Sequence, residues 1–587
     1  MLLNVFRLCK IYIMEKYEYR KDSPRRHLEY PEKTMFEMIR NVAEQYPDAP
    51  AYEFYGKKTN YRELIGKIET TARAFRSLGL GKDSIVTICL PNIPVAIDSF
   101  YALNRIGAVA NMIHPLSAKD EITYYMDYSR STHLVTLDMF YEKVKEAVKN
   151  ADHPVKIIIA RMQDVLPVHL GFFYALKEGR KYRKYPEKDD LLWKDFLKMG
   201  QDLPLPECKF EKNYTSVILY SGGTSGKPKG CCLSDLNFNA LAIQAKEFIQ
   251  VYLGPGMLML SCMPMFHGFG LGINIHTVLI HGACCILMPS FNIKTYSEML
   301  VKKKPNFIAG VPTIFEALLH APALEGQDLS FLKGMFCGGD SLPLEVKHKV
   351  DAFLKEHHAE IQVREGYGLT ECVTASCLTP RDEYRPNSIG LPFADTYYDV
   401  VKPGTDISLK PGEEGEIVLK GPTVMVGYLD RPEETAETLR KRSDGDTWLY
   451  TGDLGYMDED GYIYFVQRMK RMIITNGYNV YPGILENAID SCEGVDYSCV
   501  IGVKDTRRGQ RVKAFVVVKD GYPRDDAMKK KIMDHISTKV AAYALPKEIE
   551  YRDELPKTLV GKIAYRILEE EENKKAETQA QETPKKK

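Results

Sequence analysis

Residues 220–230 combine glycines, hydroxyls and lysines in a pattern suited to binding phosphate. The stretch reads Tyr-Ser-Gly-Gly-Thr-Ser-Gly-Lys-Pro-Lys-Gly and follows the apolar run 217–219. Glycines let backbone N–H groups turn toward an anion, hydroxyls add short donors, and lysines add positive charge. We therefore predict a phosphate-binding loop made of Ser221, Gly222, Gly223, Thr224, Ser225, Gly226, Lys227 and Lys229.

This loop differs from a Walker A loop, which has the spacing G-x-x-x-x-G-K-[ST] and leads into a helix. Gly222 and Gly226 are separated by three residues, not four. Lys227 precedes Pro228, so the hydroxyl that would bind magnesium has no place. A short apolar piece comes before a helix can begin at Ser234. Spacing, chemistry and context all exclude Walker A.

The glycine-rich stretch resembles the signature loop of the adenylate-forming superfamily, which includes acyl-CoA synthetases, firefly-type luciferases and peptide-synthetase adenylation domains. Further segments resemble family motifs in family order: 367–371 (YGLTE), 450–453 (YTGD), 468–470 (RMK) with 477–482 (GYNVYP), and 556–563 (PKTLVGKI). The resemblance covers roughly residues 30 to 570. It implies an α/β fold with a large N-terminal adenylate-forming domain and a small mobile α/β C-terminal domain.

The resemblance implies an acid:CoA ligase (AMP-forming), with ATP and coenzyme A as co-substrates and Mg²⁺ as the metal. A carboxylate attacks the α-phosphorus of ATP and releases pyrophosphate, and a thiol then displaces AMP from the acyl-adenylate. Neither step needs a protein nucleophile, so the protein must gather, neutralise and align negative groups. The expected substrate is a medium- or long-chain fatty acid or another bulky apolar acid.

Four residues are expected to act in catalysis. Lys562 can bridge the substrate carboxylate and the α-phosphate with one ammonium group. Glu371 is expected to bind Mg²⁺ with Thr224 as a further metal contact, and Thr370 can donate to a phosphate oxygen. His267 matches a family position that lines the acyl pocket beside the nucleotide.

The remaining site residues follow from the same motif matching. Tyr367, next to Gly368, can stack on adenine, while Asp453 can accept from the ribose hydroxyls with Arg468 as a second contact. The adenine wall is expected to contain Gly338, Gly339 and Asp340, although the family more often has a small residue in place of Asp340. The expected acyl pocket, which has no Arg or Lys, consists of His267, Phe269, Ile273, Gly310, Val311, Thr374 and Ala375.

The hinge and the CoA passage are expected near residue 470. Lys470 fits the family hinge, and Gly477 with Tyr478 is expected to line the pantetheine tunnel, where a side chain at 477 would narrow the passage. Two neighbours depart from the family pattern: Gln467 replaces the usual Gly or Asp, and Arg471 stands where an acidic residue is frequent. Neither change is evidence against adenylation or against rotation of the C-terminal domain about the hinge.

Three alternative functions remain open. An acyl-AMP ligase could load a carrier-protein phosphopantetheine in trans, since no carrier domain follows residue 563. A luciferase-like oxygenase is rare but not formally excluded by the sequence. A non-catalytic scaffold with the same fold is disfavoured, because decay would be expected to erase some of the residues Thr224, Glu371, Asp453, Arg468 and Lys562.

Composition indicates an ordinary globular protein with more than one domain. The chain has 587 residues, 44% hydrophobic and 27% charged, and its 79 basic residues balance 79 acidic ones. This balance gives no electrostatic case for nucleic acid. Thirteen scattered cysteines indicate reduced thiols in a cytoplasmic protein, with neither a disulfide framework nor a zinc site.

Alternating helical and strand patterns favour α/β layers, for example the helical spacing of apolar residues in 36–43 and the buried-strand run 84–90. We expect an N-terminal extension (1–29), the adenylation domain (30–467), a hinge (468–472), a C-terminal lid domain (473–568) and a disordered charged tail (569–587). The N-terminus has no signal-peptide pattern, and no stretch reaches the roughly 18 apolar residues of a membrane span. The expected oligomeric state is monomer or homodimer.

One segment departs from the alternation of helical and strand patterns. Residues 165–176 are largely apolar, and Lys177, Arg180, Lys181, Arg183 and Lys184 follow closely. A surface helix hairpin packed on the body explains this pattern. The alternative is a peripheral contact with the inner face of the membrane through residues 165–184.

Overall fold

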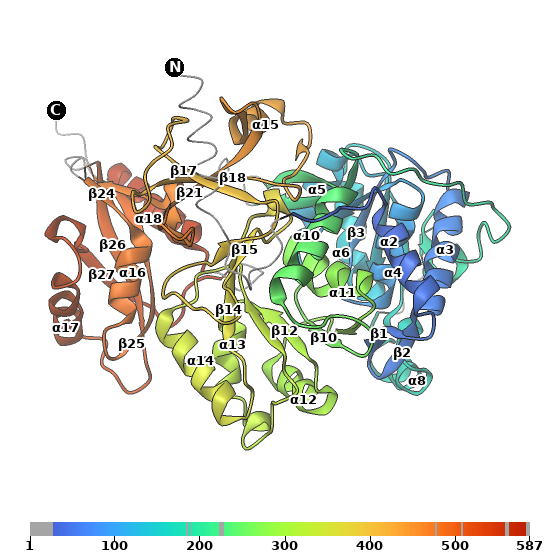
Figure 1. The fold of residues 1–587 in the computed structure, drawn as a ribbon, viewed down its shortest axis with the longest axis horizontal. Helices are drawn as coiled ribbons and strands as arrows, with labels where there is room; N and C mark the ends of the chain where they lie inside the picture. The colour runs from blue at the N-terminus through green and yellow to red at the C-terminus, as the bar shows by residue number, and fades with distance from the viewer. Residues whose placement is uncertain are drawn as a thin grey trace. The chain divides into compact units, whose positions relative to one another are not determined.

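The computed structural model describes residues 27–182, 186–187, 189–221, 228–475, 478–505, 509–557 and 563–582. The chain divides into two compact units (Figure 1). Unit 1 comprises Met1–Tyr398, Leu419–Tyr450 and Asp460–Tyr462, and unit 2 comprises Asp399–Val418, Thr451–Glu459 and Ile463–Lys587. The α/β fold class is confirmed, whereas the domain limits read from the sequence remain predictions.

Two sheets with mainly parallel pairing form the centre of unit 1. In the described residues the first contains nine strands, in the spatial order β16 (Leu391–Pro392), β15 (Cys377–Leu378), β14 (Val363–Tyr367), β13 (Gly334–Cys337), β12 (Phe307–Gly310), β10 (Leu258–Ser261), β11 (Cys284–Leu287), β1 (Pro50–Phe54) and β2 (Lys57–Asn60). The second contains eight described strands, in the order β19 (Gly427–Tyr428), β9 (Lys229–Ser234), β8 (Thr215–Ser221), β4 (Val109–Met112), β3 (Ile85–Cys89), β5 (His133–Leu137), β6 (Lys156–Ala160) and β7 (Leu191–Leu192). The strands that flank the phosphate loop, β8 and β9, are antiparallel.

Helix α2 (Met35–Gln45) contains the apolar residues for which the sequence predicts helical spacing. The Thr34 hydroxyl accepts from the Glu37 N–H, and the Glu37 carboxylate accepts from the Thr34 N–H at 2.8 Å, which forms a capping box. Its buried residues include the predicted Phe36, Ile39, Val42 and Ala43. The other α-helices described in unit 1 are α3 (Tyr61–Ser77), α4 (Pro94–Arg105), α5 (Lys119–Ser129), α6 (Tyr141–Lys149), α7 (Met162–Val165), α8 (Val168–Lys177), α9 (Trp193–Phe196), α10 (Asp235–Ile249), α11 (Thr277–Ile280), α12 (Ile293–Lys303), α13 (Pro312–Leu318), α14 (Leu344–Glu356) and α15 (Pro432–Thr438).

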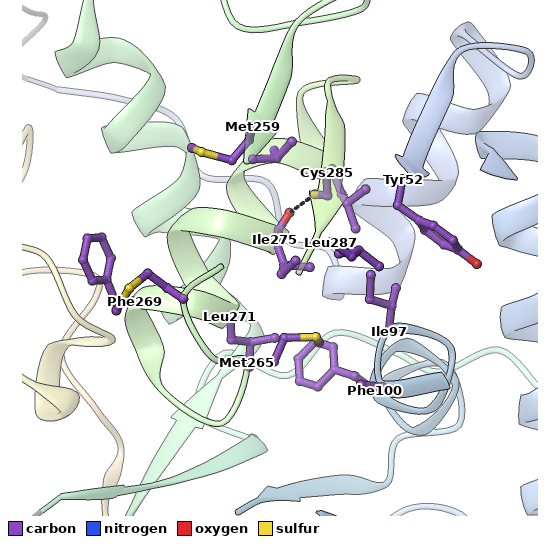
Figure 2. Close-up of a cluster of buried hydrophobic side chains, with 14 of the residues drawn as sticks. Tyr52, Ile97, Phe100, Met259, Met265, Phe269, Leu271, Ile275, Cys285 and Leu287 are labelled. Carbon is purple, nitrogen blue, oxygen red and sulfur yellow. Dashed lines mark hydrogen bonds between the residues drawn. The ribbon is translucent and has the colours of Figure 1, made fainter. Parts of the chain in front are cut away.

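The core of unit 1 anchors the segment that follows His267. This segment forms a π-helix, η2 (Phe269–His276). Met265 and Leu271 are fully buried and point toward Phe100 of α4 (Figure 2). Because burying each such side chain contributes about 1.5–3 kcal/mol, η2 is firmly fixed.

Unit 2 contains a β-hairpin and a small α/β part. Strand β21 (Thr447–Met457), which also pairs with β20 (Leu439–Lys441), is antiparallel to β22 (Ile463–Arg468). Strands β17 (Tyr397–Val401), β18 (Gly415–Lys420) and β21 contribute residues to both units. The remaining elements described in unit 2 are β23 (Ile473–Thr475), β24 (Tyr478–Val480), α16 (Pro482–Asp490), β25 (Val495–Asp505), β26 (Gly509–Val518), α17 (Asp526–Ser537), β27 (Glu548–Tyr551) and α18 (Tyr565–Glu582).

Helix α18 corrects the expectation of a disordered tail from residue 569. Leu568 is fully buried, and the largely buried carboxylate of Glu572 lies 3.0 Å from the ammonium of Lys513. Lys513 is itself only 2% exposed. The charged composition gives no sign of this helix, because the residue that pairs with Glu572 is Lys513, which lies on a strand far away in the sequence. None of the described helices combines the length and hydropathy that crossing a bilayer requires.

Candidate functional site

A cavity in unit 1 is lined by residues of η2, α10, α11 and the first sheet. Its empty volume, open mouth included, is about 710 Å³. Six residues of the predicted site line this cavity: Phe269, Ile273, Gly338, Gly339, Thr374 and Ala375. Three other residues predicted for the acyl pocket, His267, Gly310 and Val311, do not line it.

The cavity wall is apolar and carries no charged side chain among the described residues. Phe307, Phe336 and Phe393 contribute aromatic rings. Burial raises the pKa of the Cys377 thiol to about 12 and that of Cys337 well above its usual value, so both thiols stay neutral. A second charge on a bound acid would therefore lose its hydration without gaining a partner.

The loop after β14 connects this cavity to the predicted metal ligand. A Cβ atom at Gly368 would lie 2.0 Å from the Thr374 carbonyl oxygen, so this fold of the loop requires glycine. Val373 is fully buried with φ +65°, a conformation that costs a β-branched residue about 1–3 kcal/mol. The loop carries Glu371 in the turn η4 (Thr370–Cys372) and Thr374 at the cavity.

The His267 motif packs against the same loop. A Cβ atom at Gly268 would lie 1.7 Å from the Val373 carbonyl oxygen, which brings the two backbones into direct contact. The Nδ1 atom of His267 accepts from the Phe269 N–H at 3.2 Å. His267 is therefore held next to the Tyr367–Ala375 loop, and its role beside the nucleotide stays a prediction.

Glu371 forms a polar cluster with two residues from other segments. The Tyr428 hydroxyl donates to Oε1 of Glu371 at 2.8 Å. Burial and the Glu371 charge raise the pKa of Tyr428 well above its usual value, so the hydroxyl keeps its proton. Lys229 Nζ lies 4.8 Å from the centroid of the Tyr428 ring, within cation–π range.

Tyr428 was not predicted from the sequence. It lies on the two-residue strand β19, where it pairs with Cys231 of β9. This pairing joins segments far apart in the chain, so neither spacing nor periodicity gave a signal for it. Only the sheet brings it to Lys229 and Glu371.

The flanks of the phosphate loop are described, but residues 222–227 (Gly222, Gly223, Thr224, Ser225, Gly226 and Lys227) lie outside the described residues. Ser221 at the end of β8 lies opposite Lys229 at the start of β9. The carbonyl of Pro228 accepts from the Tyr124 hydroxyl at 2.8 Å. Strand β9 follows the loop, and helix α10 begins only at Asp235, close to the start expected at Ser234.

The predicted ribose contacts lie opposite each other in unit 2. Asp453 and Arg468 are cross-strand partners in the β21–β22 hairpin, with 3.6 Å between Asp453 Oδ1 and Arg468 Nε. The Asp453 side chain is 2% exposed and that of Arg468 is 55% exposed. Both amide atoms of the adjacent Gln467 are buried with no hydrogen-bond partner in the described residues.

The other predicted residues are described in part or not at all. Asp340 is exposed, and its carboxylate accepts from the Ser341 N–H at 2.9 Å. Lys470 and Tyr478 are described by their backbone, in the 3₁₀ turn η5 (Met469–Arg471) and in β24. Lys562 and Gly477 lie outside the described residues. Arg471 pairs with Glu486 through two nitrogen–oxygen contacts, the shorter of 2.5 Å.

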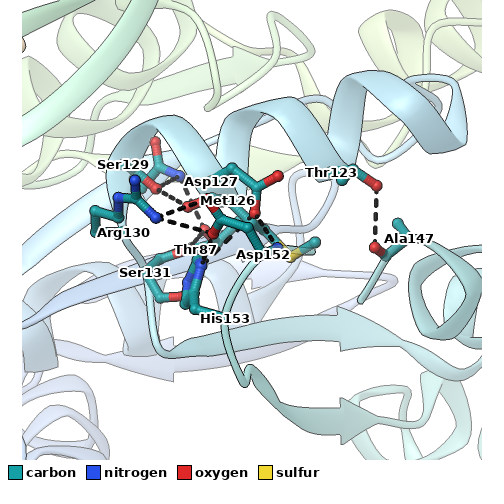
Figure 3. A network of polar contacts seen from close by, with 11 residues as sticks. Thr87, Thr123, Met126, Asp127, Ser129, Arg130, Ser131, Ala147, Asp152 and His153 are labelled. Carbon is teal, nitrogen blue, oxygen red and sulfur yellow. Dashed lines mark hydrogen bonds and ion pairs between the residues drawn. The ribbon is translucent and has the colours of Figure 1, made fainter. Parts of the chain in front are cut away.

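One cluster of carboxylates and imidazole outside these segments has metal-binding residue types, namely Asp127, Asp152 and His153 (Figure 3). Arg130 donates to both oxygens of Asp152 at 2.8 and 2.9 Å. The His153 ring contacts Asp152 through Nδ1 and the Ser131 carbonyl through Nε2. Arg130 already supplies positive charge to Asp152, so we interpret the cluster as a structural network of hydrogen bonds and ion pairs.

Comparison with known proteins identifies the class. Residues 39–429 match the model of the AMP-binding enzyme family, and residues 485–562 match that of the AMP-binding enzyme C-terminal domain. The chain belongs to this family of AMP-binding enzymes, which confirms the adenylate-forming resemblance.

Related proteins are similar over nearly their full length. A long-chain-fatty-acid–CoA ligase of Bacillus subtilis is 34% identical over 94% of this chain and 97% of its own. A feruloyl-CoA synthase of an Amycolatopsis species is 30% identical over 89% and 95%. The anthranilate CoA ligase AuaEII, solved with anthranoyl-AMP, shares the fold at a TM-score of 0.80 and 22% identity, covering 93% of this chain and 98% of its own.

Proposed function

We propose that this protein activates a medium- or long-chain fatty acid, or another bulky apolar acid, with ATP and transfers the acyl group to CoA. The observation that supports this substrate class is the apolar cavity beside Thr374, which has no charged residue in its described wall. The similarity of this chain to a long-chain-fatty-acid–CoA ligase and to a feruloyl-CoA synthase supports both the acid class and the acceptor.

The reaction assigns a role to each part of the site. One carboxylate oxygen of the acid bonds to the α-phosphorus as the bond to pyrophosphate breaks, and Lys562 neutralises the two approaching anions. The CoA sulfur then bonds to the acyl carbon, AMP leaves, and the thiol proton is lost. Asp453 and Arg468 hold the ribose, and the phosphate loop holds the phosphates.

Glu371 and Thr224 would hold Mg²⁺, which neutralises phosphate charge when bound. Glu371 suits this role: Oε1 is oriented by Tyr428, and in the described residues Oε2 has no hydrogen-bond or ion-pair partner. An oxygen with a fixed partner on one side and a free lone pair on the other suits a hard cation.

Pyrophosphate release measured over a panel of acids, with and without CoA, tests the proposal. We expect turnover to rise with apolar size among monocarboxylic acids and to require CoA for repeated cycles. Ile273→Trp, at the cavity wall, should shift the preference to smaller acids. The same change at the half-buried Ile243 of α10, away from the wall, should not. Preference for a short dicarboxylic acid would contradict the proposal.

A further inference from the structure

Helix α8 exposes its apolar side chains instead of burying them. Val168 is 90% exposed, Phe172 62%, Phe173 65% and Leu176 46%. At 3.6 residues per turn these side chains cover an arc of about 140° around the helix. A surface helix normally turns such an arc toward the core, but α8 turns it toward solvent.

The packing of the opposite side fixes this orientation. A Cβ atom at Gly171 would lie 2.6 Å from the carbonyl oxygen of Gln163 in α7, so the two backbones touch. Tyr174 packs against the core of unit 1. Rotating the helix to bury Phe172 and Phe173 would break both contacts, so the exposure is built into the fold.

Positive charge follows the exposed arc. Lys177 and Arg180 are exposed and have no ion-pair partner among the described residues, while Lys181 pairs with Glu178 at 3.0 Å. The whole chain has equal numbers of basic and acidic residues, so this is a local excess. Arg183 and Lys184 lie outside the described residues.

We propose that α8 is the contact of this protein with an anionic lipid surface. Its apolar arc suits the boundary between headgroups and acyl chains, and Lys177 and Arg180 suit anionic headgroups. The helix has ten residues, or about 15 Å, half of the ~30 Å hydrocarbon core, so it lies in the surface rather than across it.

A second copy of the chain fits this surface less well than lipid. A two-fold contact through α8 would bring two sets of the same cations together, and their repulsion would oppose the apolar contact. The benefit of lipid contact, access to an acid that partitions into bilayers, rests on the proposed function. Lipid binding itself does not depend on the proposed function, so an experiment can contradict one of these two proposals and leave the other intact.

Co-sedimentation with vesicles tests the inference on the full chain, without acid, ATP or CoA. We expect binding to phosphatidylglycerol-rich vesicles at low salt and much weaker binding to pure phosphatidylcholine. Phe172→Asp with Phe173→Asp should reduce partitioning at least about tenfold. Lys177→Gln with Arg180→Gln should reduce it by about 30-fold on the anionic vesicles only.

The matched control is Leu116→Asp with Tyr252→Asp, which replaces side chains that are 59% and 61% exposed elsewhere on unit 1. This control should bind like the wild type. Thermal unfolding checks that each variant is folded, and the exposed Lys177 and Arg180 changes keep the test decisive if the aspartates disturb folding. Wild-type protein that stays in the supernatant at low salt, or α8 variants that bind normally, would overturn the inference. So would a wild-type dimer that the α8 variants convert to monomer without any vesicle binding.

Discussion

Replacing Tyr428 with phenylalanine should weaken the response of adenylation to Mg²⁺. The change removes one hydroxyl, 2.8 Å from Glu371 Oε1, and keeps the ring that faces Lys229. A hydrogen bond to a charged group contributes about 1.5–3 kcal/mol, and loss of a partner that orients a metal ligand typically lowers metal affinity about 10- to 100-fold. We therefore expect the Mg²⁺ concentration for half-maximal pyrophosphate release to rise about 10- to 100-fold.

The assay is a Mg²⁺ titration of pyrophosphate release at fixed ATP, with Mn²⁺ binding in the presence of ATP followed by electron paramagnetic resonance as a second readout. Thioester formation from supplied acyl-adenylate should not change. Tyr128→Phe is the control, because the Tyr128 hydroxyl donates to the Leu429 carbonyl instead of a carboxylate. A Mg²⁺ midpoint for Tyr428→Phe equal to that of Tyr128→Phe would refute the reasoning.

Three more outcomes are expected. Lys562→Ala should slow pyrophosphate release about 100- to 1,000-fold but spare thioester formation from supplied acyl-adenylate; near-normal release would reject the role of Lys562. Gly477→Leu should let acyl-adenylate form and persist in the presence of CoA, whereas equal loss of both half-reactions would make Gly477 a folding residue. Burial raises the pKa of Asp98 from 3.8 to about 7, so the native state binds more protons and the free energy of unfolding falls as pH rises between these values. Asp98→Asn should remove that fall, at most about 3 kcal/mol between pH 5 and pH 8, in urea unfolding at these two pH values; an unchanged pH profile would contradict this.

Elements with local signals were predictable. Helix α2 follows from its capping box and apolar spacing, and the antiparallel strands around the phosphate loop follow from the apolar runs on both sides of it. The hairpin that pairs Asp453 with Arg468 was also visible in the sequence, because a polar turn separates two strand-like segments. Each of these depends on neighbours a few residues away.

Features made by distant contacts were not predictable. Helix α18 looks like a solvated tail until Lys513, on another strand, pairs with Glu572. Tyr428 has no local pattern, and reaches Glu371 through the pairing of β19 with β9. The outward orientation of α8 depends on the contact between Gly171 and Gln163, so the sequence left two interpretations of that segment open.

The loop from Tyr367 to Ala375 is expected to tolerate few substitutions during evolution. One short backbone carries both the predicted metal ligand Glu371 and the cavity residue Thr374, and the contacts of Gly268 and Gly368 leave no room for an added carbon. A substitution that reshaped the cavity from this side would also move the carboxylate. New acid preferences are therefore expected to arise on the other walls, in η2, α10 and β12, where the cavity can change shape while the loop keeps its form.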